Sequence, residues 1–260
     1  RLSFDLAYYS NETTNDIVNV ATSGSSGYGG ASANLGKVSN KGFELLVSGT
    51  PIRTENFSWN LSLNGAYNEG LVVATDDVDS DVNLDEPRTR NVRITHQVGE
   101  RYGTIVGVSY ERDASGAIKY DIDSEGVPRA VEGERKTLGE GVAPISVGFT
   151  NSFTYKNFNL NMLIDGKFGG QIFSGTNTLL YGNGLHKNTL EGRETGLVVS
   201  GIDNATDLPF TTTVAPENLQ SYWGRINNIA EEFVEDSDYI KFRQISLGYT
   251  LPQKALENVF

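Results

Sequence analysis

The sequence predicts an all-β protein, specifically part of the wall of a transmembrane antiparallel β-barrel. Long segments alternate bulky apolar residues with small polar ones, short turns alternate with long loops, and charged residues gather in those loops. No stretch of about 18 apolar residues is present, so the sequence has no candidate for a membrane-spanning helix. We therefore expect strands to make any passage through a bilayer.

The strongest alternation lies at residues 57–68, which read FSWNLSLNGAYN. Bulky side chains occupy the odd positions Phe57, Trp59, Leu61, Leu63 and Tyr67. Small neutral side chains, mostly Ser and Asn, occupy the even positions. A period of two is that of a strand with two unlike faces. We expect the bulky face to contact lipid and the polar face to line the interior of the barrel.

Five further segments follow the same pattern. In decreasing clarity they cover residues 145–155, 158–168, 2–9, 43–52 and 239–251. Asn151 is an exception on an apolar face, and Leu163 is one on a polar face. Helical periodicity is scarce, and we expect a short surface helix at 216–230.

The connections between these strands differ greatly in length. Residues 53–56 and 156–157 form two tight antiparallel hairpins. Long loops cover about 10–42, 70–144 and 174–238. Because antiparallel strands reverse direction, all short turns fall at one end of the sheet and all long loops at the other. Short periplasmic turns opposite long extracellular loops are typical of outer-membrane barrels.

A secreted soluble β-sandwich that binds carbohydrate or adheres to surfaces is the alternative interpretation, since its strands also alternate. Three features favour the barrel. The polar faces carry Ser, Asn, Thr and Gly where a solvated face usually carries Lys and Glu. The strands exceed the usual soluble length of about 5 to 6 residues. The loops exceed about 15 residues, which is uncommon in compact soluble domains.

Composition excludes several other classes of function. The net charge of −12 argues against nucleic-acid binding, which needs clustered Lys and Arg. The absence of cysteine excludes thiolate zinc sites, disulfides and cysteine nucleophiles. No catalytic motif is evident, so we expect a protein that is not an enzyme and requires no cofactor.

Six strands are too few to close a barrel, since the smallest bacterial ones have about eight and an open edge in lipid leaves backbone groups unpaired. Residues 1–4 read as the middle of a strand, and residues 259–260 read as the start of another. We therefore expect the sequence to be a piece of a longer protein.

Three segments resemble the C-terminal barrel of SusC/RagA-type TonB-dependent outer-membrane transporters. They are LGKVSNKGFEL at 35–45, ISVGFTNSFTYKNF at 145–158 followed by DGKFGGQIF at 165–173, and DYIKFRQISLGYTLP at 238–252. Their order and spacing match across nearly the whole chain. The resemblance implies that residues 1–260 are part of one barrel domain of about 22 strands.

The same resemblance implies a function and partners. Members of this family lie in the outer membrane of Gram-negative bacteria and import oligosaccharides or peptides. They work beneath a SusD-like surface lipoprotein that acts as a lid. TonB drives import through an N-terminal region, next to a plug domain, and neither region is contained in these residues.

One acidic segment has the spacing of a calcium loop. Asp121, Asp123 and Glu125 alternate before Gly126, and Glu132 falls at the twelfth position. We name the first three as candidate ligands of a structural Ca²⁺. An ordinary acidic turn remains the alternative, because no helices are expected on either side of the segment.

Three aromatic residues in the 174–238 loop are candidates for substrate contact: Tyr181, Tyr222 and Trp223. Such rings stack on sugars or pack against peptides. Packing within the loop itself is the alternative interpretation.

Overall fold

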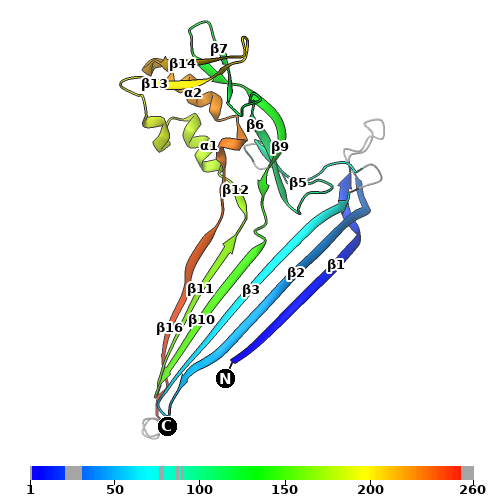
Figure 1. Ribbon diagram of the computed structural model, residues 1–260, viewed down its shortest axis with the longest axis vertical. Helices are drawn as coiled ribbons and strands as arrows, with labels where there is room; N and C mark the ends of the chain where they lie inside the picture. The colour runs from blue at the N-terminus through cyan, green and yellow to red at the C-terminus, as the bar shows by residue number, and fades with distance from the viewer. Residues whose placement is uncertain (1, 21–30, 76–78, 86–87, 89–90, 253–260) are drawn as a thin grey trace.

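A six-stranded antiparallel sheet forms the main body of the protein (Figure 1). The structure is a computed structural model that describes residues 2–20, 31–75, 79–85, 88 and 91–252. The strands of the sheet, which we call the wall, are β1 (Leu2–Val20), β2 (Ala31–Arg53), β3 (Phe57–Ala74), β10 (Ile145–Tyr155), β11 (Phe158–Phe168) and β16 (Tyr239–Tyr249). The order of these six strands across the sheet is the same as their order in the sequence. The six predicted strands are confirmed.

Both predicted hairpins are present at one end of the wall. In the first, the Thr54 amide donates a hydrogen bond to the Phe57 carbonyl at 2.7 Å. In the second, Tyr155 pairs directly with Phe158, and Lys156 takes the positive φ of 50° that a two-residue turn requires. Both short turns therefore lie at the lower end of the wall in Figure 1, opposite the long connections.

The first three strands extend further than the sequence indicated, to 19, 23 and 18 residues. Residues 10–20 and 31–42, expected as loop, are instead paired strand. Glu12 and Lys37 form an ion pair across these extensions at 3.0 Å. Charged and small residues occupy both faces there, so the apolar alternation ends although the backbone pairing continues.

The other two long connections fold into a layer at the far end of the wall, which we call the loop assembly (Figure 1). One four-stranded sheet contains β4 (Val82–Asp85), β5 (Val92–His96), β6 (Thr104–Tyr110) and β9 (Glu132–Glu140). A second contains β7 (Lys119–Ile122), β8 (Pro128–Ala130), β13 (Leu197–Asp203) and β14 (Leu208–Val214). A two-stranded sheet pairs β12 (Gln171–Phe173) with β15 (Val234–Asp236).

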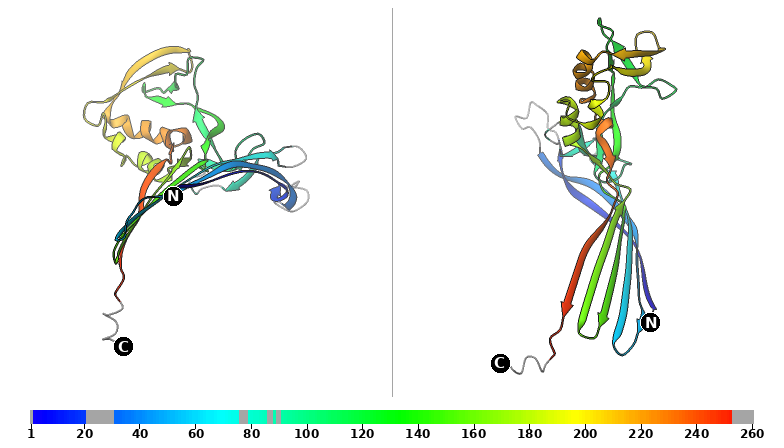
Figure 2. Two further views of the ribbon diagram at one scale, coloured as in Figure 1. Left: turned by 60° about the horizontal axis from the view of Figure 1, so that its bottom comes forward. Right: turned by 90° about the vertical axis from the view of Figure 1, so that its left-hand side faces the viewer.

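Short helices complete the loop assembly. They are α1 (Gly175–Gly182), α2 (Leu219–Ile226) and the 3₁₀ turns Lys187–Leu190, Pro216–Asn218 and Ala230–Phe233. The expected helix at 216–230 corresponds to α2 with its flanking turns, but Leu219, Tyr222 and Ile226 on it are buried, so it is not a surface helix. Among the residues described, no helix is long and apolar enough to span a membrane. Figure 2 shows that the wall is curved and that the loop assembly stands at one end of it.

Candidate functional site

The apolar face of the wall is uncovered. Leu2, Phe4, Ile240 and Leu247 are each more than 70% exposed. The described part of the chain places no second sheet against this face, as a β-sandwich would require. On the inner strands, Phe43 and Phe158 are still 52% and 50% exposed, so large apolar side chains face outward across the whole sheet, which fits contact with lipid. The sandwich interpretation therefore fails on the packing.

The polar exception on this face has a partner. Strand register places Asn151 between Leu61 of β3 and Met162 of β11. The Trp59 indole Nε1 donates a hydrogen bond to the Asn151 Oδ1 at 3.1 Å, and Asn151 is 9% exposed. Because a polar group in hydrocarbon must be satisfied within the protein, this bond explains how an amide is tolerated among lipid-facing side chains.

We expect Trp59→Phe to lower the free energy of unfolding by about 1 to 3 kcal/mol, because it leaves the buried amide of Asn151 without its donor. Adding Asn151→Leu to that variant removes the unpaired group and should recover most of the loss. Denaturant unfolding of the full-length protein in lipid vesicles measures both values. If Trp59→Phe lowered the free energy of unfolding by the same amount in the wild type and in the Asn151→Leu background, the hydrogen bond would contribute nothing to stability.

The opposite face of the wall is polar and concave. An open cavity of about 740 Å³ runs along it, bordered mainly by small polar residues such as Ser48, Asn60, Ser62 and Ser152. Hydroxyls pair across the strands here, as between Ser3 and Ser48 at 2.8 Å. These groups hydrate readily, so this face is suited to line a watery passage.

Two charged residues on the polar face form an ion pair. Arg243 binds Asp165 in bidentate geometry, with Nε to Oδ1 at 2.8 Å and Nη2 to Oδ2 at 2.5 Å. The pairing of β11 with β16 shifts between Leu163 and Ile164, which inserts Arg243 as an extra residue. This β-bulge places Arg243 and Gln244 together between the apolar residues Phe242 and Ile245, so the apolar alternation of β16 changes phase at this point. The sequence pattern did not reveal this pair.

The predicted substrate-contact residues lie together in the core of the loop assembly. Tyr181 on α1 and Tyr222 on α2 are 4% and 7% exposed, and Trp223 is partly buried. The Tyr181 ring meets Trp223 at 5.5 Å and Phe233 at 5.0 Å, both edge to face. Burial raises the pKa of Tyr222, the expected result for a phenol in an apolar core. Tyr181 and Trp223 also border an open cavity of about 520 Å³, and their contact with substrate stays a prediction.

The acidic segment forms a tight hairpin turn between β7 and β8. The Asp123 Oδ1 accepts hydrogen bonds from the amides of Glu125 at 3.0 Å and Val127 at 2.9 Å. Gly126 has a φ of 78°, which other residues rarely adopt. The same turn occurs ten residues earlier, where Asp113 accepts from the amides of Ser115 and Ala117, both at 2.9 Å. The chain thus uses one Asp-x-x-Gly turn twice.

The candidate calcium ligands are engaged separately. Asp121 accepts a hydrogen bond from Asn204 at 2.9 Å, whereas Asp123 pairs with Arg129 at 3.0 Å. Glu132 pairs with Arg225 at 2.8 Å. Across the described ranges, no three His, Cys, Asp or Glu side chains are arranged to hold a metal ion. The structure does not bring Asp121, Asp123 and Glu125 together. The hydrogen bonds that the Asp123 carboxylate accepts within the turn are sufficient to explain an aspartate at this position.

We expect Asp123→Ala to expose the amides of the β7–β8 hairpin to hydrogen exchange, whereas Glu125→Ala, the matched control, should not. Adding Ca²⁺ or a chelator should leave the exchange of both proteins unchanged. Calcium-dependent protection of this hairpin would instead establish a metal site.

The hairpin should also respond to acid. The hydrogen bond from the Val127 amide, together with those from Glu125 and Arg129, lowers the pKa of Asp123 from that of an ordinary aspartate. The stability contributed by a carboxylate with a lowered pKa is complete above the unfolded value and is lost as pH falls through the folded one. Protection of the hairpin amides from hydrogen exchange should therefore be complete at neutral pH and decline below about pH 4. In Asp123→Ala, the protection should not show this decline with pH.

Comparisons with known proteins agree with the architecture. Residues 1–161 match the family model "TonB dependent receptor-like, beta-barrel". TonB-dependent receptor P3 of Formosa agariphila is 26% identical over 276 residues, covering 98% of this chain. TonB-dependent receptor SusC of Bacteroides thetaiotaomicron is 22% identical over 227 residues, covering 84% of this chain. The chain spans 26% and 21% of the length of these two relatives.

Solved structures show the same fold. The RagAB peptide importer in its open-open state superposes with a TM-score of 0.66 and 17% identity over 98% of this chain, which corresponds to 27% of that one. The RagAB peptide transporter gives a TM-score of 0.61 at 17% identity, again over 98% of this chain and 27% of that one. This chain therefore belongs to the TonB-dependent receptor-like β-barrel family, and its six long strands are a portion of the wall of such a barrel.

Proposed function

We propose that the protein imports a nutrient such as an oligosaccharide or peptide across the outer membrane of a Gram-negative bacterium, in a TonB-dependent manner. The observation that carries this proposal is the wall with two unlike faces, one apolar and uncovered and the other polar and concave. A wall of this kind separates lipid from a water-filled interior. Family membership supports the same function.

The mechanism is binding and gated passage, with no covalent chemistry. Small hydroxyl and amide side chains on the polar face offer weak hydrogen bonds along the passage, and Arg243 and Asp165 neutralise each other there. Charged residues gather in the loop assembly, which lies where cargo would enter. TonB would supply the pull through a region beyond these residues.

We further propose that a SusD-like surface lipoprotein covers the loop assembly. Large apolar side chains are exposed around α1 and the 3₁₀ turn that follows it, with Leu179, Leu185 and Leu190 at 58%, 73% and 59%. Exposed apolar clusters of this kind fit a protein interface. Purification of the full-length protein from its own membranes should recover the lipoprotein, and Leu185→Asp should weaken that association.

Membrane fractionation and uptake test the main proposal. The full-length protein should require detergent for extraction and should be found with the outer membrane. A strain without the gene should fail to grow on one class of polymeric nutrient, and loss of TonB should have the same effect. Recovery of the full-length protein from an aqueous extract without detergent would contradict the proposal.

A further inference from the structure

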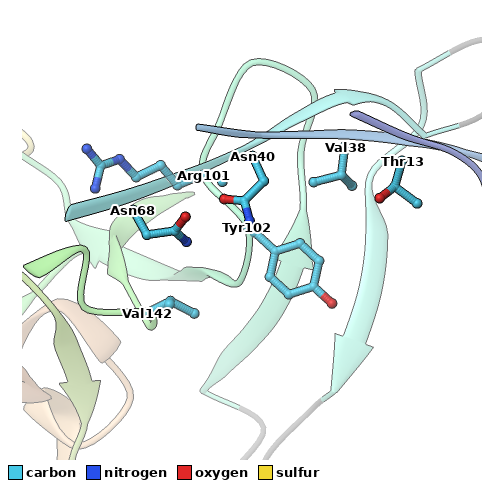
Figure 3. A pocket seen from close by; sticks show the side chains of 8 residues that line it. Thr13, Val38, Asn40, Asn68, Arg101, Tyr102 and Val142 are labelled. Carbon is cyan, nitrogen blue, oxygen red and sulfur yellow. The ribbon is translucent and has the colours of Figure 1, made fainter. Parts of the chain in front are cut away.

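A cavity of about 280 Å³ opens where the upper parts of β1, β2 and β3 meet the loop assembly (Figure 3). Three strands, β1, β2 and the end of β3, contribute to it together with two loop segments that approach from the side. The side chains that border it include Thr13, Val38, Asn40, Asn68, Tyr102 and Val142. It is separate from the larger cavity lower on the polar face.

The position of Tyr102 follows from backbone pairing. The Tyr102 amide donates to the Gly70 carbonyl at 3.0 Å, and the Val72 amide donates to the Glu100 carbonyl at 3.0 Å. Residues 99–102 thus run beside the top of β3. Since Gly70 also pairs with Asn40 of β2, Tyr102 and Asn40 belong to one cross-strand row and share the polar face. Gly70 between them has no side chain to separate them.

A second row of the same design lies directly below. Tyr9 of β1 pairs with Gly42 of β2, which pairs with Asn68 of β3. The Tyr9 side chain crosses over Gly42, where a Cβ would collide with its ring, and donates a hydrogen bond from its hydroxyl to the Asn68 Oδ1 at 2.6 Å. This bond fixes the Asn68 amide at the edge of the cavity.

The Tyr102 ring is held in place but remains accessible. The His96 ring packs against it with centroids 4.2 Å apart and the planes tilted by 55°. Tyr102 is nevertheless 43% exposed. An aromatic ring supported in this way, beside a cavity, is a platform on which the C–H groups of a ligand can pack.

Asn40 supplies an acceptor without a donor. Its Oδ1 is buried, and no hydrogen-bond donor reaches it within the described residues. Buried polar atoms are almost always paired, so such an atom at a cavity calls for a donor from a ligand or from water. Figure 3 shows the amides of Asn40 and Asn68 near Tyr102. Together they offer a set of neutral hydrogen-bonding groups.

The charged side chain on the cavity lining, Arg101, is already paired. Its guanidinium points away from Tyr102 (Figure 3) and pairs with Glu140 at 2.9 Å and Glu69 at 3.7 Å. A charged ligand group would lose its hydration here without gaining a counter-charge. Hydroxyl groups, in contrast, can donate to Asn40 and accept from Asn68.

We infer that this cavity binds one ring of an uncharged saccharide, stacked on Tyr102 and hydrogen-bonded by Asn40 and Asn68. The volume is at the small end of ligand sites and suits a single sugar unit of a longer chain. This inference rests on the proposed import function, and it narrows the cargo to neutral glycans. A peptide, whose termini are charged, is the competing cargo.

Binding to the purified full-length protein in detergent tests the inference without requiring transport. Calorimetry would use neutral hexasaccharides of glucose, xylose and mannose, an acidic oligogalacturonate and a mixture of decapeptides as probes. At least one neutral hexasaccharide should bind, and Tyr102→Ala should weaken its binding about ten-fold. Tyr102→Phe should retain binding because the ring remains, and Asn40→Ala should weaken it several-fold.

Tyr155→Ala is the matched control, because this tyrosine is exposed near a short turn at the other end of the wall. Heat-dependent migration on gels verifies that each variant retains a folded barrel. The inference is overturned if no neutral hexasaccharide binds, if binding is limited to peptides or the acidic probe, or if Tyr102→Ala and Asn40→Ala both bind as the wild type does. Wild-type binding of a neutral glycan without uptake by cells would instead contradict the import function alone.

Discussion

Leu63→Arg is expected to destabilise the folded barrel by about 2 to 4 kcal/mol, the cost of a cationic side chain on the lipid face near the middle of a bilayer. Leu63 lies six positions beyond Phe57, the first residue of β3 after the short turn. At roughly 3.3 Å per residue and a tilt of about 40°, it stands about 15 Å above the turn, near the centre of the apolar band. Its cross-strand neighbours Val47 and Phe149 are apolar as well.

Asn64→Arg is the matched control, because the next residue along β3 points to the polar face and is exposed there. The same charge should then remain hydrated and have little effect. Unfolding of the two full-length variants in vesicles, or their yield in the outer membrane, measures the difference. Equal destabilisation by both substitutions would mean that the bulky face does not contact hydrocarbon.

Phe233→Ala is expected to destabilise the loop assembly by about 3 to 5 kcal/mol, as is usual when a buried phenylalanine is truncated. Phe233 is 1% exposed, and its ring packs edge to face on Tyr181. Its carbonyl also accepts the amide of Ser174, just before α1, at 2.8 Å. The substitution should therefore increase hydrogen exchange in α1 and α2 while the wall keeps its protection.

Leu208→Ala provides the comparison, since this side chain is also large and apolar but is 64% exposed. It should leave exchange in α1 and α2 unchanged. If Phe233→Ala increased exchange in the wall as much as in the helices, the loop assembly and the wall would have to unfold as one unit.

The sequence predicted the wall well because lipid on one face and water on the other impose a strict period of two. Where that contrast ends, the prediction ends too. The upper parts of β1 and β2 carry polar residues on both faces, so the strands could not be distinguished from loop although their backbones remain paired. In the loop assembly, β7 and β8 have 4 and 3 residues, too few to show any period.

The functional residues were harder to predict because their partners lie far apart in the chain. Asn151 stood out as an exception, but its donor Trp59 is 92 residues away. The parallel pairing of β7 with β13 joins residues near 120 to residues near 202. Tyr102 was not singled out at all. The available signal was Gly70, a glycine inside a strand, which often marks the close approach of another group.

The backbone bonds that tie residues 99–102 to β3 limit how the entrance can work. Three of them, at Gly70 and on both sides of Val72, extend the hydrogen-bond ladder of the wall into this segment. A hinged flap at this point would have to break all three hydrogen bonds. We therefore expect residues 99–102 to form a rigid side of the barrel entrance. Movement that admits cargo is therefore expected further out, in the part of the loop assembly built from β13, β14 and the helices.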